Sequence, residues 1–251
     1  MTALRAGLLI LLTFSVLAHG VTETWSEVAM IVGAALLFLF WGLRSGDRRK
    51  VEVVGSPLSW PLLALGILFL AQGWLGLSLA PEQTREEFLK SAALFLIFFL
   101  TVQAFRTTLH LHRFLWYVVV LGFLVSVVGL LQFFSAPQKL YWFREIPANA
   151  IPFGPYVNRN HFAGLMELIL PLGLAALTLR GVAPEKLQLL GVMTVVSLGA
   201  VFVSGSRGGI VALLSSFVLT KQFRLSLDLH LKMQVFAEEL FLFISLGDHC
   251  F

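Results

Sequence analysis

The feature that most constrains this chain is a series of eight apolar runs separated by short polar connections. The runs cover residues 4–20, 28–43, 60–80, 87–105, 114–135, 161–180, 187–203 and 208–223. A helix crosses a bilayer with about 20 residues, so most of these runs are long enough to be spans. Charged residues make up only 13% of the chain, against about 25% in soluble domains. We therefore predict an all-α fold, a polytopic transmembrane helix bundle with about 7–8 spans.

The first and last runs are open to other interpretations. The first run contains Arg5 near its start and small residues, Ala18 and Gly20, near its end, so it also fits a cleaved signal peptide. The last run is short enough to be a broken or re-entrant helix. Neither alternative changes the orientation expected for the other spans.

Basic residues are distributed unevenly between alternate connections. The connections on the side of the N-terminus hold eleven lysines and arginines, and those on the opposite side hold six. The positive-inside rule therefore predicts a cytoplasmic N-terminus, with the connection 136–160 and Arg207 on the periplasmic or extracellular side. The net charge of +4 is then explained by cytoplasmic loops beside anionic lipid, and we expect the membrane, not nucleic acid, as the partner of these charges.

Polar side chains concentrate at the start of the sixth run. Asn158, Arg159, Asn160 and His161 are consecutive, and an apolar run follows them. We predict that Asn160 is the N-cap, so that the N–H groups of residues 161–163 and the positive end of the helix dipole form an anion site. The simpler alternative is a capped helix end whose polar residues face water.

Glu167 favours the functional interpretation, because an ionisable group within a span usually faces a bundle interior or a water-filled cavity. Asn160, Gly164 and Glu167 have the spacing i, i+4, i+7, which places them on one helix face. Pro171 cannot donate a hydrogen bond to the carbonyl of Glu167 and predicts a kink. A polar stripe is therefore expected to run from the loop into the membrane.

A second polar cluster occupies residues 204–209, with the sequence Ser-Gly-Ser-Arg-Gly-Gly. Ser206 is expected to cap the last helix, and the glycines allow close approach to the backbone. Arg207 suits bidentate recognition of a phosphate or carboxylate. The structural alternative is an Arg207–Glu167 ion pair that holds two helices together.

Other candidate sites are weak. Glu82, Glu86 and Glu87 are interpreted as a solvated turn and helix start, and the single cysteine, Cys250, excludes a cysteine-based metal site. The chain has no nucleotide-binding glycine loop, catalytic triad or zinc spacing. We therefore expect no metal and no cofactor.

Two regions follow from this pattern: a transmembrane domain at 1–220 and an atypical tail at 221–251. Between Leu225 and Val235 apolar and polar residues alternate, which is typical of a strand. A lone strand is not stable, so the tail is interpreted as disordered, as an interfacial helix, or as foreign sequence such as a truncation or frameshift product.

The segment 153–164, which leads to Leu170 and Pro171 and is followed about 35 residues later by 204–209, resembles the O-antigen ligase family. This family includes O-antigen polymerases and protein O-oligosaccharyltransferases, and the resemblance covers about 55–220. Membership implies a multi-pass protein of the bacterial inner (cytoplasmic) membrane. The implied activity is metal-independent, inverting glycosyl transfer from an undecaprenyl pyrophosphate-linked glycan to a lipid or protein acceptor on the periplasmic face.

The resemblance also implies roles for individual residues. Arg207 matches the arginine of the family's Ser-Arg-Gly motif, which is expected to bind the donor's pyrophosphate and stabilise the leaving group. Asn158, Asn160 and His161 match the Asn-x-Asn-His segment and are expected to position the substrate. Arg159 and Glu167 are grouped with them as substrate-binding residues.

The chain also departs from the family. Family members continue into a large periplasmic loop that carries a further arginine and a histidine proposed as general base. Nothing after Thr220 corresponds to that loop, and His230 and His249 stand in a different context. We therefore expect a ligase-type fragment that is inactive by itself.

Two other classes of protein are alternatives to a glycosyl transferase. In a transporter or flippase-like module, Glu167, Pro171 and Arg207 would line a translocation path. Such a module predicts internal repeats and polar groups that reach both faces, whereas here the polar residues cluster on one side. A non-catalytic membrane scaffold is the third alternative.

Overall fold

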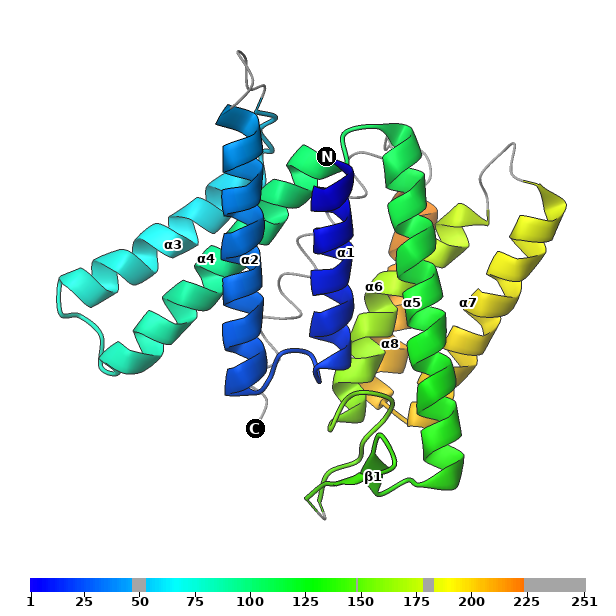
Figure 1. The fold of residues 1–251 in the computed structure, drawn as a ribbon. Coiled ribbons are helices and arrows are strands. Elements are labelled where there is room, and N and C mark those ends of the chain that lie inside the picture. Colours follow the sequence, from blue (N-terminus) through cyan, green and yellow to red (C-terminus); the bar gives the residue numbers. More distant parts are fainter. Residues whose placement is uncertain (47–52, 148, 178–182, 224–251) are drawn as a thin grey trace. The chain divides into compact units, whose positions relative to one another are not determined.

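The computed structural model describes residues 1–46, 53–147, 149–177 and 183–223. In this part of the chain the protein has eight α-helices and one short antiparallel hairpin (Figure 1). The helices are α1 (Thr2–Leu17), α2 (Thr24–Gly46), α3 (Ser59–Trp74), α4 (Pro81–Ala104), α5 (Thr108–Ser135), α6 (Arg159–Ala176), α7 (Pro184–Ser204) and α8 (Arg207–Phe223), and the strands are β1 (Lys139–Leu140) and β2 (Arg144–Glu145). The predicted all-α fold is confirmed.

Four of these helices are long and apolar enough to cross a membrane: α2, α4, α5 and α7. Helices α1 and α3 are apolar but shorter. Helix α6 begins with three polar residues, which lowers its mean hydropathy. The chain therefore has at least four candidate membrane spans within its described residues, and the full set of 7–8 spans stays a prediction.

The third and fourth predicted runs have different boundaries in the structure. Run 60–80 is a helix only as far as Trp74, because Gly76 takes a positive φ of 64° and the Leu77 N–H donates back to the Gln72 carbonyl. Helix α4 then begins at Pro81, six residues before the predicted run. Pro81 suits this position, because the first residue of a helix has no intrahelical acceptor for its N–H.

Helix α7 has an apolar outer face and a buried face that combines small and hydroxyl side chains with larger apolar ones. The exposed residues are large and apolar: Leu189, Val192, Val195 and Phe202. The buried positions include Thr194, Ser197, Ala200 and Ser204. Small and hydroxyl residues on the packed face, with aliphatic residues outside, are typical of helices that pack against each other in lipid.

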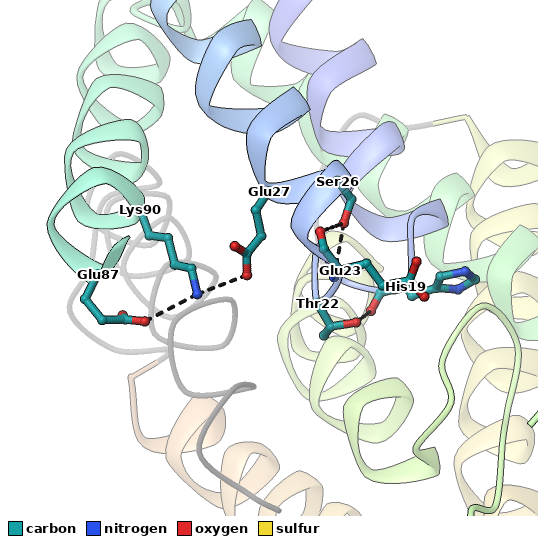
Figure 2. Close-up of polar contacts among 7 residues, drawn as sticks. All are labelled: His19, Thr22, Glu23, Ser26, Glu27, Glu87 and Lys90. Atoms are coloured by element: carbon teal, nitrogen blue, oxygen red, sulfur yellow. Dashed lines mark hydrogen bonds and ion pairs between the residues drawn. The ribbon is translucent and has the colours of Figure 1, made fainter. Parts of the chain in front are cut away.

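The described residues separate into two compact units, one up to Thr107 and one from Thr108 onward. In the first unit α2 contacts α1 and α4, and α3 contacts α4. Figure 2 shows Lys90 of α4 reaching towards α2, where its Nζ lies 3.0 Å from Glu27 Oε1 and 3.3 Å from Glu87 Oε1. The interpretation of Glu87 as a solvated residue was therefore wrong: one turn before Lys90, it joins an ion pair between helices.

The turn between α1 and α2 also carries local polar contacts (Figure 2). Ser26 Oγ donates to the Glu23 carbonyl at 2.7 Å and accepts from the Glu23 N–H at 3.3 Å. This reciprocal bond satisfies a backbone donor at the start of α2, as in a capping box. It fixes the beginning of the helix that carries Glu27.

In the second unit α6 contacts α5, α7 and α8 (Figure 1). Two of these approaches are close at glycines. A Cβ on Gly122 of α5 would lie 2.8 Å from Ile169, and a Cβ on Gly173 of α6 would lie 2.9 Å from Thr194 Oγ1 of α7. Helix α6 therefore contacts each of the other three helices of this unit, and α5 also packs against α7.

Replacing Lys90 with Met should destabilise the first unit. Glu27 and Glu87 would then lose their counter-charge while remaining largely buried, since their side chains are only 18% and 27% exposed. We expect a loss of about 1–3 kcal/mol, below the value for fully buried pairs because water still reaches these groups. Thermal unfolding of the purified protein in detergent measures this loss. Arg85→Gln on the exposed part of the same helix is the control, and an equal effect of both substitutions would contradict the role of the ion pair.

Candidate functional site

Helix α6 begins two residues earlier than the sequence predicted. Asn158, not Asn160, is the N-cap: its backbone is extended, with φ −115° and ψ 122°, and its Oδ1 accepts from the Asn160 N–H at 2.9 Å. An N-cap needs this non-helical backbone together with a side-chain acceptor. Asn160 lies inside the first helical turn, so its amide side chain is available for another contact.

The first backbone amides of α6 are satisfied by the protein itself. The Arg159 N–H donates to the Ile151 carbonyl at 2.9 Å, and the His161 N–H donates to the Asn158 carbonyl at 3.1 Å. With the Asn160 N–H bonded to Asn158, these three donors all have acceptors. The sequence predicted that the N–H groups of residues 161–163 are free to bind an anion, and for the His161 N–H this prediction is wrong.

Ser206 caps α8, as the sequence predicted. Its Oγ accepts from the Gly209 N–H at 3.2 Å, and its carbonyl accepts from the Ile210 N–H at 3.0 Å. The same hydroxyl donates to Asn160 Oδ1 at 2.9 Å. One buried side chain thus joins the two polar segments that the sequence singled out, 46 residues apart.

Arg159 strengthens the same junction. Its Nη1 donates to the Ser204 carbonyl at 3.4 Å. Between α7 and α8 Gly205 takes φ +67°, and a Cβ there would lie 3.1 Å from that Nη1. Glycine is therefore suited to this turn for two reasons, its left-handed backbone and the guanidinium lying over it.

Arg207 is exposed at the first position of α8. Among the described residues it makes no hydrogen bond and no ion pair, so that part of the chain uses none of its five N–H donors. Glu167 is half-buried on α6, and the alternative Arg207–Glu167 ion pair is not formed. The arginine is thus placed beside the junction without being part of its bonding.

The loop before α6 is folded against α5 by a tight turn. Phe153 and Tyr156 exchange two backbone hydrogen bonds of 3.0 and 3.2 Å around Gly154, whose φ is +61°. The Phe153 ring lies against Gly129 of α5, where a Cβ would overlap it, and its centroid is 4.5 Å from that of Phe162. The Gly-Pro pair at 154–155 signals such a turn in the sequence, but its burial depends on α5.

The tyrosines of this loop stay protonated near neutral pH. Burial raises the pKa of Tyr141 to about 12. Burial and, to a smaller extent, the neighbouring Tyr141 raise the pKa of the Tyr156 phenol. The Tyr156 ring lies 6.4 Å from the half-buried His161 ring. Neither phenol is therefore suited to act as a general base at neutral pH.

The structure brings most of the predicted site residues to one place. Asn158, Arg159 and Asn160 bond to each other or to the α7–α8 turn, and Arg207 stands at that turn. His161 is the residue of α6 that follows Asn160, whereas Glu167 lies about two turns further along the same helix. Ser206 was expected only as a cap, and its bond to Asn160 had no signal in the sequence beyond the two polar side chains. No cluster of three or more potential metal ligands occurs among the described residues.

No family model, curated protein or solved structure matches this chain.

Replacing Gly209 with Ala should separate α6 from α8. A Cβ at Gly209 would overlap the Cβ of Ala163 and press on Ser206 at 3.1–3.4 Å, whereas a Cβ at Gly208 would meet nothing within 4 Å. We expect Gly209→Ala to destabilise the protein by about 1–3 kcal/mol, and Gly208→Ala to be neutral or to stabilise it by up to about 1 kcal/mol. Thermal unfolding in detergent compares the two neighbours, and similar values would contradict the close approach.

The Asn160–Ser206 bond can be measured with a double-mutant cycle. Ser206→Ala removes both the cap and the donor, and should cost about 1–2 kcal/mol of stability. Asn160→Ala should cost less in that background than in the natural chain, with a coupling of about 0.5–1.5 kcal/mol, because the two side chains share the bond. Ser215→Ala is the control, since Ser215 is exposed and bonds only within α8. Additive losses would mean that the bond does not contribute.

Proposed function

We propose that this chain is the membrane part of a glycosyl transferase of the O-antigen ligase or polymerase type. In this proposal it acts on an undecaprenyl pyrophosphate-linked glycan at the periplasmic face of the bacterial inner membrane. The observation that carries the proposal is the junction of α6 with the α7–α8 turn, where Asn160 and Ser206 are bonded at 2.9 Å and Arg207 stands exposed beside them.

The surroundings of Arg207 suit an anionic ligand. Its side chain stands at the N-terminus of α8, where the helix dipole is positive. Gly208 is exposed and has open space where a side chain would begin. A guanidinium that can bind two oxygens of one phosphate, beside an open first turn, is a good donor set for a diphosphate.

The position of the turn suits a ligand carried by a lipid. Helix α7 is a candidate membrane span and ends at Ser204, immediately before the turn. If α7 crosses the bilayer, Arg207 lies at the membrane boundary, where the diphosphate of a polyprenyl donor would be found. A second substrate, a lipid or protein acceptor, would approach from the aqueous side.

The contacts suggest a division of roles among the predicted site residues. Arg207 is proposed to bind the diphosphate and stabilise it as the leaving group. Asn158, Arg159 and Asn160 are proposed to hold the turn in place, because their polar groups contact the protein. His161 and Glu167 also interact within the protein, and they are proposed to contact the glycan or the acceptor on the resemblance alone.

A translocation path receives less support from these contacts. Such a path needs polar groups that turn towards a common channel through the span. The buried hydroxyls Ser126 of α5 and Thr194 of α7 donate instead to carbonyls of their own helices, Gly122 and Leu190, each at 2.8 Å. The transferase is therefore the better supported of the two functions.

Replacing Arg207 with Lys tests the proposal. Lysine keeps the charge but loses the bidentate geometry, so binding of undecaprenyl pyrophosphate to the purified full chain should weaken about tenfold or more, corresponding to about 1.4 kcal/mol. Native mass spectrometry in detergent or nanodiscs measures the binding. Arg113→Lys, an exposed arginine on α5, is the matched control.

Two outcomes would sink the proposed role of Arg207. One is undiminished binding by the Arg207→Lys chain, and the other is an equal loss in the Arg113→Lys chain. Unfolding temperature is measured for both variants, so that a loss of binding can be separated from a loss of fold.

A further inference from the structure

The connection between α5 and α6 begins with a hairpin that the last turn of α5 holds in place. Strands β1 and β2 pair in antiparallel register, Lys139 with Glu145 and Leu140 with Arg144. Leu140 is completely buried. Gln132 Oε1 accepts from the Tyr141 N–H at 2.8 Å. The hairpin is therefore fixed to the helix and cannot swing independently of it.

The tip of this hairpin, residues 141–143, is held in a strained backbone conformation. Tyr141 and Trp142 take φ values of 51° and 67°, where bulky side chains are disfavoured by about 1–3 kcal/mol each. The Trp142 indole Nε1 donates to Ser135 Oγ at 2.7 Å, and the Tyr141 ring stacks on Phe143 with centroids 6.3 Å apart. These contacts compensate the strain and fix the directions of the aromatic rings.

The strained tip presents its aromatic side chains outward. Phe143 is 79% exposed, Trp142 is 43% exposed, and Phe134 in the last turn of α5 is 74% exposed. The exposed cation Lys139 stands at the base of the hairpin. Exposed apolar patches of this kind mark contact with a partner or a membrane. An exposed tryptophan whose indole N–H is hydrogen-bonded, such as Trp142, is suited to the boundary between lipid and water.

The position of the hairpin favours the bilayer as its partner. Helix α5 is the most hydrophobic of the four candidate spans, with 28 residues and a mean hydropathy of 2.6, and it ends at Ser135. The hairpin starts four residues later and is bonded to that end. An element fixed to the end of a membrane span lies at the level of the lipid headgroups. The exposed charges of the hairpin, Lys139, Arg144 and Glu145, sum to +1, which complements anionic headgroups there.

We propose that residues 139–145 form a membrane-interface anchor, with Trp142 and Phe143 inserted among the headgroups and the first carbons of the acyl chains. The anchor fixes the depth of the end of α5. It also fixes the start of the connection that leads to Asn158 and the N-terminus of α6. The proposal rests on the hairpin and on α5 as a membrane span, and it does not require the proposed transferase function.

Depth-dependent quenching of Trp142 tests the anchor. The full chain is reconstituted into vesicles of phosphatidylcholine and phosphatidylglycerol that contain lipids brominated either near the headgroup or near the end of the acyl chain. The chain has 6 tryptophans, so the signal of Trp142 is taken as the difference between the natural chain and Trp142→Phe. We expect the larger loss of this fluorescence with bromines near the headgroup.

A second reporter keeps the test valid if Trp142→Phe perturbs the hairpin. In a Trp142→Phe chain, Phe143→Trp moves the indole to the more exposed position, and its signal should show the same preference for shallow bromines. If neither reporter is quenched by brominated lipid, or if quenching is strongest near the bilayer centre, the proposal is wrong. Quenching by aqueous acrylamide without quenching by lipid would place the tip in water, and protection from both quenchers would indicate a protein partner instead.

Discussion

The second unit depends on the close approach of α6 to three other helices at positions where side chains are small. Gly122 on α5, Gly173 on α6 and Gly209 on α8 each stand where a Cβ would meet a neighbouring side chain at less than normal contact distance. In lipid, helices gain little from burying apolar surface against each other, so close packing and interhelical hydrogen bonds must hold them together. The polar junction at the start of α6 exists because this packing brings α8 against it.

The Asn160–Ser206 bond and the Gly209–Ala163 contact support each other. Ser206 is buried, so its hydroxyl is costly to leave without a partner. It accepts from the Gly209 N–H and donates to Asn160, and both bonds require α8 to lie close to α6. A side chain at Gly209 would push the helices apart and break the bond, although Gly209 itself carries no polar side chain. The close packing at Gly209 and the hydrogen bonds of Ser206 therefore depend on each other.

The sequence predicted what local physics determines and failed where tertiary contacts decide. The helical class follows from the apolar runs, and the Ser206 cap follows from a serine directly before a helix. The N-cap of α6 was misplaced, because Asn158 and Asn160 are equally good N-cap residues by type, and the loop contact at the helix start, from the Arg159 N–H to the Ile151 carbonyl, has no signal in the sequence. The pairing of Glu87 with Lys90 and Glu27 was also missed, since it depends on α2 lying against α4.

The two arginines at the junction illustrate how packing separates residues that look equivalent in the sequence. Both Arg159 and Arg207 stand at the first position of a helix and follow a residue that caps it. Arg159 lies over Gly205 and donates to the Ser204 carbonyl, so part of its hydrogen-bonding capacity is used by the protein. Arg207 is exposed and makes no hydrogen bond or ion pair with the described residues. The guanidinium of Arg207 is therefore the one of the two that keeps its hydrogen-bonding capacity towards the described residues unused, while that of Arg159 contributes to the α7–α8 turn.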